Sequence, residues 1–560
     1  MKSLRILYHI VRADFYERFR RYNVLIVIGL VIFLTTLYLP PQDVGRLAFN
    51  VGGYRGIYNS AWVGATVTVL TVIFMSLPGF YLVKNAITRD EDTKVGQIIA
   101  TTSLSKVQYI FGKMISNWVF LAAAAGVGML SAMGIQLLRG ESLKISLSGY
   151  LLPYLLITLP MMALMAAAAV LFESIRRLRR GFGNVVFFFL YLINYWILIA
   201  MTILLLQNTA GVSGPSVPLI PEPTGALEIF RNISVAGMEL IPGHPSGLDL
   251  GNPFQVYGQI GTFVWTGINW KASSILGRLL WVAVAIGIAS AAAVRFDRFD
   301  PSSIKVRVRN KKAPSRSKPD IHPAQAPDSI RPASTALSAS VRHENRLNSF
   351  LHIVSSELRL MLKGQRWWWY AAALGLITAA VAFPGTETRQ IILPIVFVWP
   401  LLIWSQMGNR EIQNRTDQLV FSSAYPLRRH LSASWVTGFI LTLITGSGVI
   451  IRLITTSSWS AVLAVVIAAA FIPALALALG VWSRSSRLFE VVYLILWTLG
   501  PMNRMMAAFG FPMSADQLPV LDFIGSSDAA ISAGIPLYYA LFTILLLALA
   551  LIGRKRQIQV

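Results

Sequence analysis

The hexapeptide His9-Ile10-Val11-Arg12-Ala13-Asp14 returns as His352-Ile353-Val354-Ser355-Ser356-Glu357, each time shortly before a long apolar run. A second echo follows in each half: Arg89-Asp90 precedes QIIATT at 97–102, and Arg410-Glu411 precedes QLVFSS at 418–423. Internal repetition of this kind indicates a duplicated unit whose copies bury apolar surface against each other. The echoes therefore predict two copies of one membrane unit.

The composition predicts an integral membrane protein. Of the 560 residues, 55% are hydrophobic and only 13% are charged, and the mean hydropathy is +0.60. This is more apolar surface than a soluble core can hide. Runs of about 20 apolar residues, enough to cross a bilayer as a helix, predict twelve spans, six in each half. They start near Val24, Trp62, Met114, Tyr150, Asn184, Ile275, Trp367, Ile391, Ser432, Trp459, Glu490 and Ile531.

The predicted fold is an all-α membrane protein of two pseudo-symmetric six-helix halves, residues 1–294 and 347–560. Apolar residues at helical spacing before the first and seventh spans predict an amphipathic, interfacial elbow helix at the start of each half. Residues 295–346 are rich in Pro, Ser, Lys and Arg without an apolar period, which is typical of a disordered basic linker. The eleventh span runs into Pro501 and is expected to be broken or re-entrant.

Charge placement predicts the orientation. The net charge is +24, and most Lys and Arg residues fall in the segments that are cytoplasmic if both termini are inside. These separate clusters suit anionic lipid head groups better than nucleic acid, which calls for one continuous basic stripe. The chain has no cysteine, so thiol chemistry and disulfides are excluded.

Motifs for enzymatic chemistry are missing. There is no G-x-x-x-x-G-K-[ST] phosphate loop, so any ATP must be bound by another polypeptide. His343-Glu344 does not start an H-E-x-x-H motif, and six scattered histidines predict no metal site. His244, Ser246 and Asp249 lie in a Pro/Gly-rich outer loop without the G-x-S-x-G turn of hydrolases, and polar loop filler explains them better.

The long inner loop at residues 84–113 is the most informative polar segment. Its charged start and hydroxyl-rich end predict a short helix that contacts a cytoplasmic partner, and the same spacing recurs in the second half. A solvated loop, or a remnant of shared ancestry without a present role, are the alternatives. The predicted contact residues are Arg89, Asp90, Glu91, Gln97, Thr101, Thr102, Arg410, Glu411, Gln418, Ser422 and Ser423.

Taken together, the elbow, the first hairpin, the Arg-acid inner loop and the long outer connection between spans five and six resemble the permeases of type-two ABC exporters, the ABCG-like class. The resemblance covers nearly the whole chain except the linker and rests on topology and loose motifs. It implies that the inner loops are coupling helices that sit on ATPase subunits, with Asp90 or Glu91 and Glu411 as the acidic contacts. Residues 173–180 and 482–487 would then supply a smaller contact.

The central thirds of the spans carry no charge, which disfavours proton coupling. In the resembled family, spans two, five, eight and eleven line the transport path, and here they offer aromatic and hydroxyl side chains suited to hydrophobic or amphipathic cargo. The alternative is that these side chains only pack helices together. The predicted cavity residues are Thr68, Thr71, Tyr191, Asn194, Tyr195, Trp399, Trp404, Tyr493 and Trp497.

The sequence thus predicts the non-enzymatic permease subunit of an ATP-driven exporter in the bacterial plasma membrane. The chain itself is expected to bind no cofactor or metal; ATP and Mg belong to two partner ATPase subunits, as a homodimer or heterodimer. A secondary transporter of the major-facilitator kind is the main alternative, although its G-x-x-x-D-R-x-G-R-R loop is absent. A membrane receptor or enzyme is a third alternative, which lacks a loop able to carry a site.

Overall fold

The computed structural model describes residues 2–20, 22–41, 50–179, 181–209, 222–241, 248–249, 260–299, 346–422, 427–508 and 519–559. Within these ranges the chain is mostly helical, and nine helices are long and apolar enough to cross a membrane. A tenth candidate is the pair formed by α1 (Lys2–Phe19) and α2 (Tyr22–Tyr38), which meet at 79°. The prediction of a helical membrane protein is confirmed at this level.

The first half is built around one long helix, α6 (Lys106–Arg139), which packs against α1, α2, α3 (Ser60–Val83) and α8 (Leu159–Ser174). A capping box starts α6, because Ser105 and Gln108 satisfy each other's backbone amides. The other helices of this half are α4 (Ala86–Asp92), α5 (Val95–Thr101), α7 (Leu147–Pro153), η2 (Tyr154–Thr158), α9 (Gly181–Thr209), α10 (Ala226–Leu240) and α11 (Ala272–Arg295).

The second half centres on α20 (Trp459–Ser483), which packs against α19 (Ser432–Thr455), α21 (Ser486–Trp497) and α24 (Ile535–Gln559). Its elbow helix is α12 (Arg346–Leu362). The other elements are α13 (Trp367–Ala382), α14 (Gly385–Glu387), η4 (Thr388–Ile392), α15 (Leu393–Val398), α16 (Leu401–Trp404), α17 (Arg410–Gln413), α18 (Asp417–Phe421), η5 (Leu427–Leu431), η6 (Thr498–Met502), α22 (Asn503–Ala508), η7 (Pro519–Leu521) and α23 (Asp528–Ser532).

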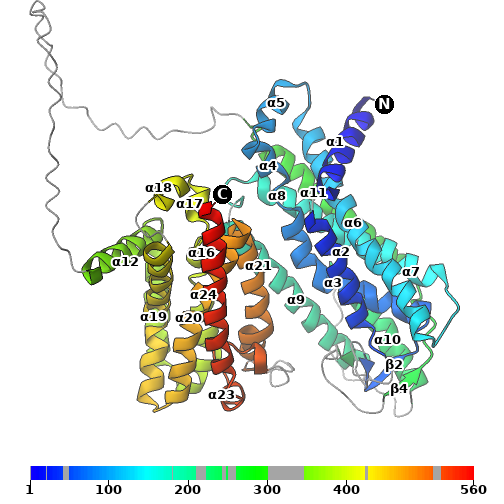
Figure 1. Cartoon of the computed structure of the whole chain (residues 1–560). Helices are drawn as coiled ribbons and strands as arrows, with labels where there is room; N and C mark the ends of the chain where they lie inside the picture. Colours follow the sequence, from blue (N-terminus) through cyan, green and yellow to red (C-terminus); the bar gives the residue numbers. More distant parts are fainter. Residues whose placement is uncertain are drawn as a thin grey trace, which may run out of the picture.

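The two ends of the molecule differ in character. One end, called here the loop end, carries α4, α5, α17, α18 and the C-terminal end of α24 (Figure 1). The opposite end carries α10, α23 and a small sheet of order β3-β1-β2-β4, made of β1 (Asn50–Val51), β2 (Tyr54–Gly56), β3 (Leu248–Asp249) and β4 (Gly261–Phe263). Its strands have two or three residues each, so the described chain remains a helical protein with one small sheet between residues 50–56 and 248–263.

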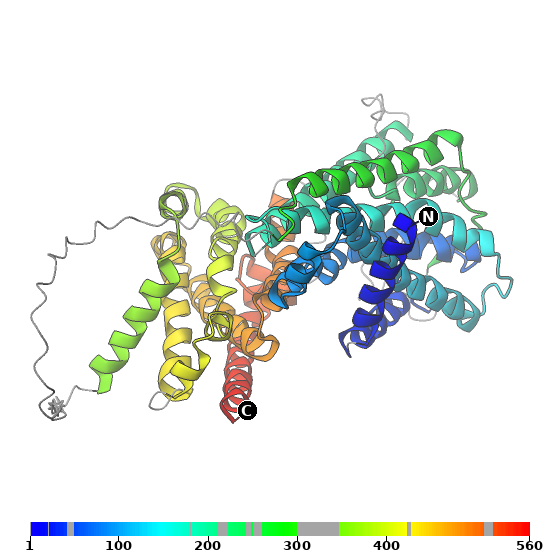
Figure 2. The same cartoon turned by 90° about the horizontal axis from the view of Figure 1, so that it is seen from above.

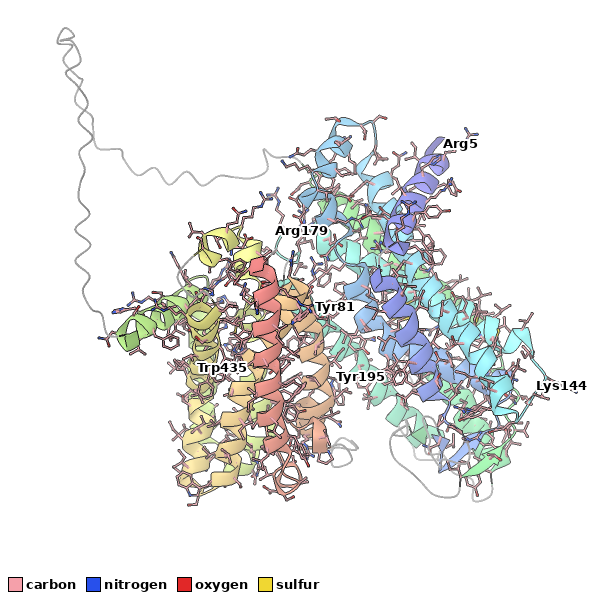
Figure 3. The ribbon with its side chains drawn as sticks, viewed as in Figure 1. Arg5, Tyr81, Lys144, Arg179, Tyr195 and Trp435 are labelled. Carbon is pink, nitrogen blue, oxygen red and sulfur yellow. The ribbon has the colours of Figure 1, made fainter. Side chains whose placement is uncertain are left out.

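The two halves lie side by side (Figures 1 and 2). Helix α21 of the second half packs against α9 and α3 of the first. Figure 3 shows Tyr81 and Tyr195, from α3 and α9, on the side of the first half that faces the second. At this junction the Phe188 and Trp497 rings meet edge to face with centroids 6.1 Å apart. The halves therefore contact each other through aromatic side chains of α9 and α21.

Twelve spans and pseudo-symmetry stay predictions, because three of the twelve expected spans are short helices. Helix α2 has 17 residues, α13 has 16, and α21 has only 12. The π-helix η6, which contains Pro501, follows α21 directly and continues into α22, so the helical geometry changes at Pro501 without a break, and a broken or re-entrant eleventh span stays a prediction. Residues 300–345, most of the predicted linker, lie outside the described residues.

Candidate functional site

The repeated loops of the sequence both lie at the loop end, and we call residues 84–113 loop A and residues 405–431 loop B. Loop A is held at its start by the buried Glu173 of α8. Glu173 Oε1 accepts from the amides of Asn85 and Ala86, and Oε2 accepts from those of Ile87 and Thr88, the last at 3.0 Å. These amides are the free donors at the start of α4, where a carboxylate is favourable. One side chain therefore fixes the entry of loop A.

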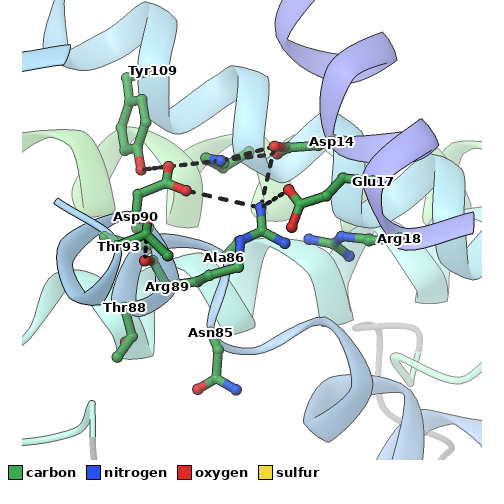
Figure 4. A network of polar contacts seen from close by, with 12 residues as sticks. Asp14, Glu17, Arg18, Asn85, Ala86, Thr88, Arg89, Asp90, Thr93 and Tyr109 are labelled. Carbon is green, nitrogen blue, oxygen red and sulfur yellow. Dashed lines mark hydrogen bonds and ion pairs between the residues drawn. The ribbon is translucent and has the colours of Figure 1, made fainter. Parts of the chain in front are cut away.

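Loop A is also tied to the elbow helix α1 by buried ion pairs (Figure 4). Lys113 Nζ lies 3.0 Å from Asp14 of α1 and 2.8 Å from Asp90 of α4. Arg89 reaches the same Asp14 at 3.4 Å, and the Tyr109 hydroxyl donates to Asp90 at 2.7 Å. Since removing one member of a buried ion pair leaves an uncompensated charge, this cluster locks the loop to the elbow.

Loop B is also tied to its elbow helix, α12, by ion pairs, and it has a further ion pair with α24. Arg410 forms an ion pair with Glu357 of α12, and His430 Nε2 lies 3.2 Å from the same carboxylate. Glu411 is buried and pairs with Arg554 of α24 at 3.3 Å. Burial opposes ionisation of Glu357, but the hydrogen bond from His430 and the charge of Arg410 lower its pKa below the usual range. Glu357 is therefore an ionised anchor.

The echoed residues make corresponding contacts in the two halves. In each, the acid of the elbow helix, Asp14 or Glu357, pairs with the first arginine of the loop. The next acid, Asp90 or Glu411, is 5% or 6% exposed and pairs with a cation inside the chain. Their assignment to an ATPase contact stays a prediction, and the structure places both carboxylates beneath the surface.

Helix α5 of loop A and helix α18 of loop B, which we call the tips of the loops, carry exposed apolar side chains instead. Ile98 of α5 is 66% exposed and Leu419 of α18 is 78% exposed. Gln97 and Gln418, the residues just before them, are exposed too. Exposed apolar side chains on short helices outside the candidate spans are suited to contact a partner. Ile98 and Leu419 were not among the predicted contact residues, although their place inside the two echoes could have pointed to them.

The remaining predicted contact residues lie around these tips. The Thr101 and Thr102 hydroxyls donate to carbonyls of their own helix, at 2.8 and 2.7 Å. Ser422 does the same to Leu419 at 3.0 Å, and Glu91 forms an exposed ion pair with Arg179 at 2.7 Å. Ser423 lies outside the described residues.

Thr68 and Thr71 line a cavity of about 10 Å³ inside the first half, between α3, α6, α7 and η2. Tyr191 reaches back from α9 to donate to the carbonyl of Ile73. Its neighbours Asn194 and Tyr195 on α9 are half-buried. The contacts described for Thr68, Thr71, Tyr191 and Tyr195 thus lie within their own half.

The tryptophans of the predicted cavity pack within the second half, and Trp497 also meets Phe188 of the first half. Trp404 and Tyr493 are fully buried with ring centroids 5.9 Å apart. Trp497 donates to the carbonyl of Pro394 at 2.8 Å, and Trp399 stacks on Trp369. Helix packing is therefore the role that the described contacts give to these side chains, and their place along a transport path stays a prediction.

A polar chain that sequence reasoning did not predict joins the two halves near the loop end. Lys84 Nζ donates to Asn184 Oδ1 at 2.6 Å, and Asn184 Nδ2 donates to Glu490 of α21. Lys84 and Glu490 are 4% and 0% exposed. The only sequence signal was a single charge at the end of each apolar run.

Comparison of the chain with protein-family models, curated proteins and solved structures finds no match.

Proposed function

We propose that this chain is the permease subunit of an ATP-driven exporter of the type-two ABC kind. The observation that carries the proposal is the pair of exposed apolar tips, Ile98 and Leu419, at the same end of two side-by-side halves. The sequence contains no phosphate loop, so nucleotide must be hydrolysed elsewhere. Two equivalent tips suit two subunits of a cytoplasmic ATPase, with the loop end and both termini facing the cytoplasm.

In this proposal the loops transmit force rather than perform chemistry. Each tip is carried on a loop that is ion-paired to its elbow helix through Asp14 or Glu357. A partner that closes on ATP and moves the tips would therefore move each elbow with its loop. The halves meet along α9 and α21, and rocking at this aromatic junction would open a path for a hydrophobic or amphipathic cargo such as a drug, peptide or lipid.

The test replaces the tip residues and leaves the buried anchors intact. Ile98→Asp combined with Leu419→Asp is expected to abolish co-purification of the partner ATPase that this proposal requires and to reduce ATP-dependent transport at least ten-fold. Leu143→Asp, at a 70% exposed apolar residue outside both loops, is the matched control. Undiminished ATPase binding by the double variant would contradict the proposal.

One observation favours the alternative, a secondary transporter of the major-facilitator kind. Glu490 is a fully buried carboxylate at the junction of the halves, and its Oε1 has no hydrogen-bond partner among the described residues. Buried carboxylates at such junctions serve as coupling sites in ion-driven transporters. Uptake by the chain alone in liposomes, driven by a proton gradient and lost in Glu490→Gln, would establish this alternative; ATP-dependent transport that survives Glu490→Gln would exclude it.

A further inference from the structure

A cavity of about 340 Å³ opens at the loop end, next to the bend between α1 and α2. Its walls come from α1, α2, the end of α3, α4, α6 and the start of α21, so both halves contribute. Figure 4 shows part of the polar wall, with Arg18 pointing toward Arg89 above Asn85 and Thr88. The polar lining is Arg18, Lys84, Asn85, Thr88, Arg89 and Arg487, with Asp92 as the one acid.

Three of these residues carry buried polar atoms without a hydrogen-bond partner among the described residues: Arg18 Nη1, Asn85 Oδ1 and Thr88 Oγ1. Arg18 is only 8% exposed, and its other terminal nitrogen donates to Asn117. An unpaired buried donor costs about 1–3 kcal/mol, and more for a charged group. A guanidinium donor and a hydroxyl that lack partners, in residues that line one cavity, therefore point to a ligand that accepts hydrogen bonds from them.

The charge of the cavity identifies an anion. Arg89 is neutralised by Asp14 and Glu17, the latter at 2.9 Å. Arg487, in contrast, is exposed and makes no side-chain hydrogen bond or ion pair within the described ranges. Its guanidinium and that of Arg18 thus have donors to spare in one cavity. Two arginines with a nearby hydroxyl match a tetrahedral oxyanion such as phosphate, which guanidinium groups bind through paired hydrogen bonds.

The other wall of the cavity is apolar and identifies the carrier of the phosphate. Val24 and Val27 of α2, Leu82 of α3 and Phe120 of α6 line it. Leu82 is 43% exposed, and these residues belong to the apolar helices rather than to the loops. Basic side chains next to an apolar wall, where α1 meets α2, suit a phospholipid head group with the start of its acyl chains.

We propose that this cavity binds the phosphate group of an acidic phospholipid. The phosphate lies between the guanidinium groups of Arg18 and Arg487 and accepts a hydrogen bond from the Thr88 hydroxyl. Asn85 Oδ1 accepts from a hydroxyl of the head group. Because the binding groups come from α1, α4 and α21, the lipid bridges the elbow, loop A and the second half. A soluble phosphate ester presents the same anion, and the experiment separates the two sources.

The experiment measures thermal unfolding of the delipidated full-length chain in neutral detergent during titration with dioleoylphosphatidylglycerol, dioleoylphosphatidylcholine or glycerol 3-phosphate. Binding to the folded state raises the unfolding temperature. We expect phosphatidylglycerol to stabilise the wild type and phosphatidylcholine to have no effect. Arg487→Gln and Thr88→Val each weaken the apparent affinity about ten-fold, as expected for one lost charge-assisted or buried hydrogen bond. Arg487→Lys recovers part of the loss.

The matched control is Arg5→Gln, which removes an exposed arginine near the start of α1, the elbow helix that carries Arg18 (Figure 3). Arg5 does not line the cavity. The control variant keeps the wild-type response if the cavity binds the lipid. Equal responses to phosphatidylglycerol in Arg5→Gln, Arg487→Gln and Thr88→Val would overturn the proposal, because general charge attraction would then explain binding. Glycerol 3-phosphate acting as strongly as the lipid would overturn the lipid assignment and give the site to a soluble phosphate ester.

Discussion

Loops A and B come from echoed sequences and make the same contact with their elbow helices, yet they are anchored to the bundle by different chemistry. Loop A begins on four backbone amides held by the Glu173 carboxylate. Near the start of loop B lies Gly408, at φ +79°, where the backbone packs closely against α20. A Cβ on Gly480 of α20 would lie 2.1 Å from the Met407 carbonyl oxygen. At its entry, loop A is thus held by a carboxylate and loop B by close backbone contact, although both loops also make buried ion pairs further along.

The repeat therefore preserves the ion pair between the elbow helix and the loop, but not the contact that holds each loop to its neighbouring span. The elbow acid and the loop arginine are paired in both halves, whereas the anchor on the neighbouring span differs. If the loops transmit movement from a partner, loop A can pivot about a carboxylate with several acceptor positions. Loop B, packed backbone to backbone, can move only with α20. The two halves are therefore expected to respond unequally to the same push.

The largest expected effect comes from removing the Glu173 carboxylate, which holds the entry of loop A. Glu173→Ala removes the acceptor of four amides, three of them on buried or half-buried residues of α4. We expect a loss of about 3–5 kcal/mol in the free energy of unfolding, as for breaking a buried charged contact. The measurement is thermal unfolding in detergent, with protease cleavage of loop A as a local readout.

The control for that variant is Glu91→Ala, which removes an exposed acid from the same loop and an ion pair with Arg179. Exposed pairs contribute about 0–1 kcal/mol, so little change is expected. If Glu173→Ala were no more sensitive to protease in loop A than Glu91→Ala, the carboxylate would not be the anchor.

The second effect breaks the anchor of loop B. Gly480→Ala places a methyl group against the backbone of Met407, which cannot yield as a flexible side chain could. Such overpacking costs about 1–3 kcal/mol. Gly446→Ala in α19 is the matched control, because nothing lies within 4 Å of its Cβ position, and alanine there is neutral or stabilising by up to about 1 kcal/mol. Equal unfolding temperatures for the two variants would refute the steric account.

The echoes in the sequence located the repeated part of this site, although Arg89 and Asp90 were predicted to contact a partner and here pair with Asp14 and Lys113 of the same chain. The part that does not repeat was not predicted. The echoes identified Asp14, Arg89 and Asp90, and the counterparts of all three in the second half make corresponding contacts. The Glu173 anchor was beyond prediction, because its four partners are backbone amides 85 to 88 positions away in sequence, and amides leave no signature in side-chain patterns.

Packing limits prediction in the same way along the spans. Helices were predicted from apolar runs, but the described contacts place aromatic residues such as Trp404 and Tyr493 inside the second half. An apolar run gives the length of a helix and leaves open which face meets which neighbour, since all faces of a membrane helix are apolar. The cavity at Arg18 and Arg487 needed the fold, because its walls come from both halves.

The smallest expected effect is a change in the pH dependence of stability when Glu357, the elbow acid that pairs with loop B, is replaced. The hydrogen bond from His430 and the charge of Arg410 outweigh burial and lower the pKa of Glu357. The unfolded chain therefore binds more protons than the folded one between the ordinary glutamate value of 4.5 and the lower folded value. Stability from Glu357 is fully present above pH 4.5 and is lost as the pH falls through the folded pKa. Thermal unfolding between pH 3 and about pH 6 should thus fall less steeply in Glu357→Gln than in the wild type. Glu387→Gln, at an exposed acid outside both loops, should keep the wild-type curve; a curve for Glu357→Gln that is equally steep would show that loop B does not rely on this anion.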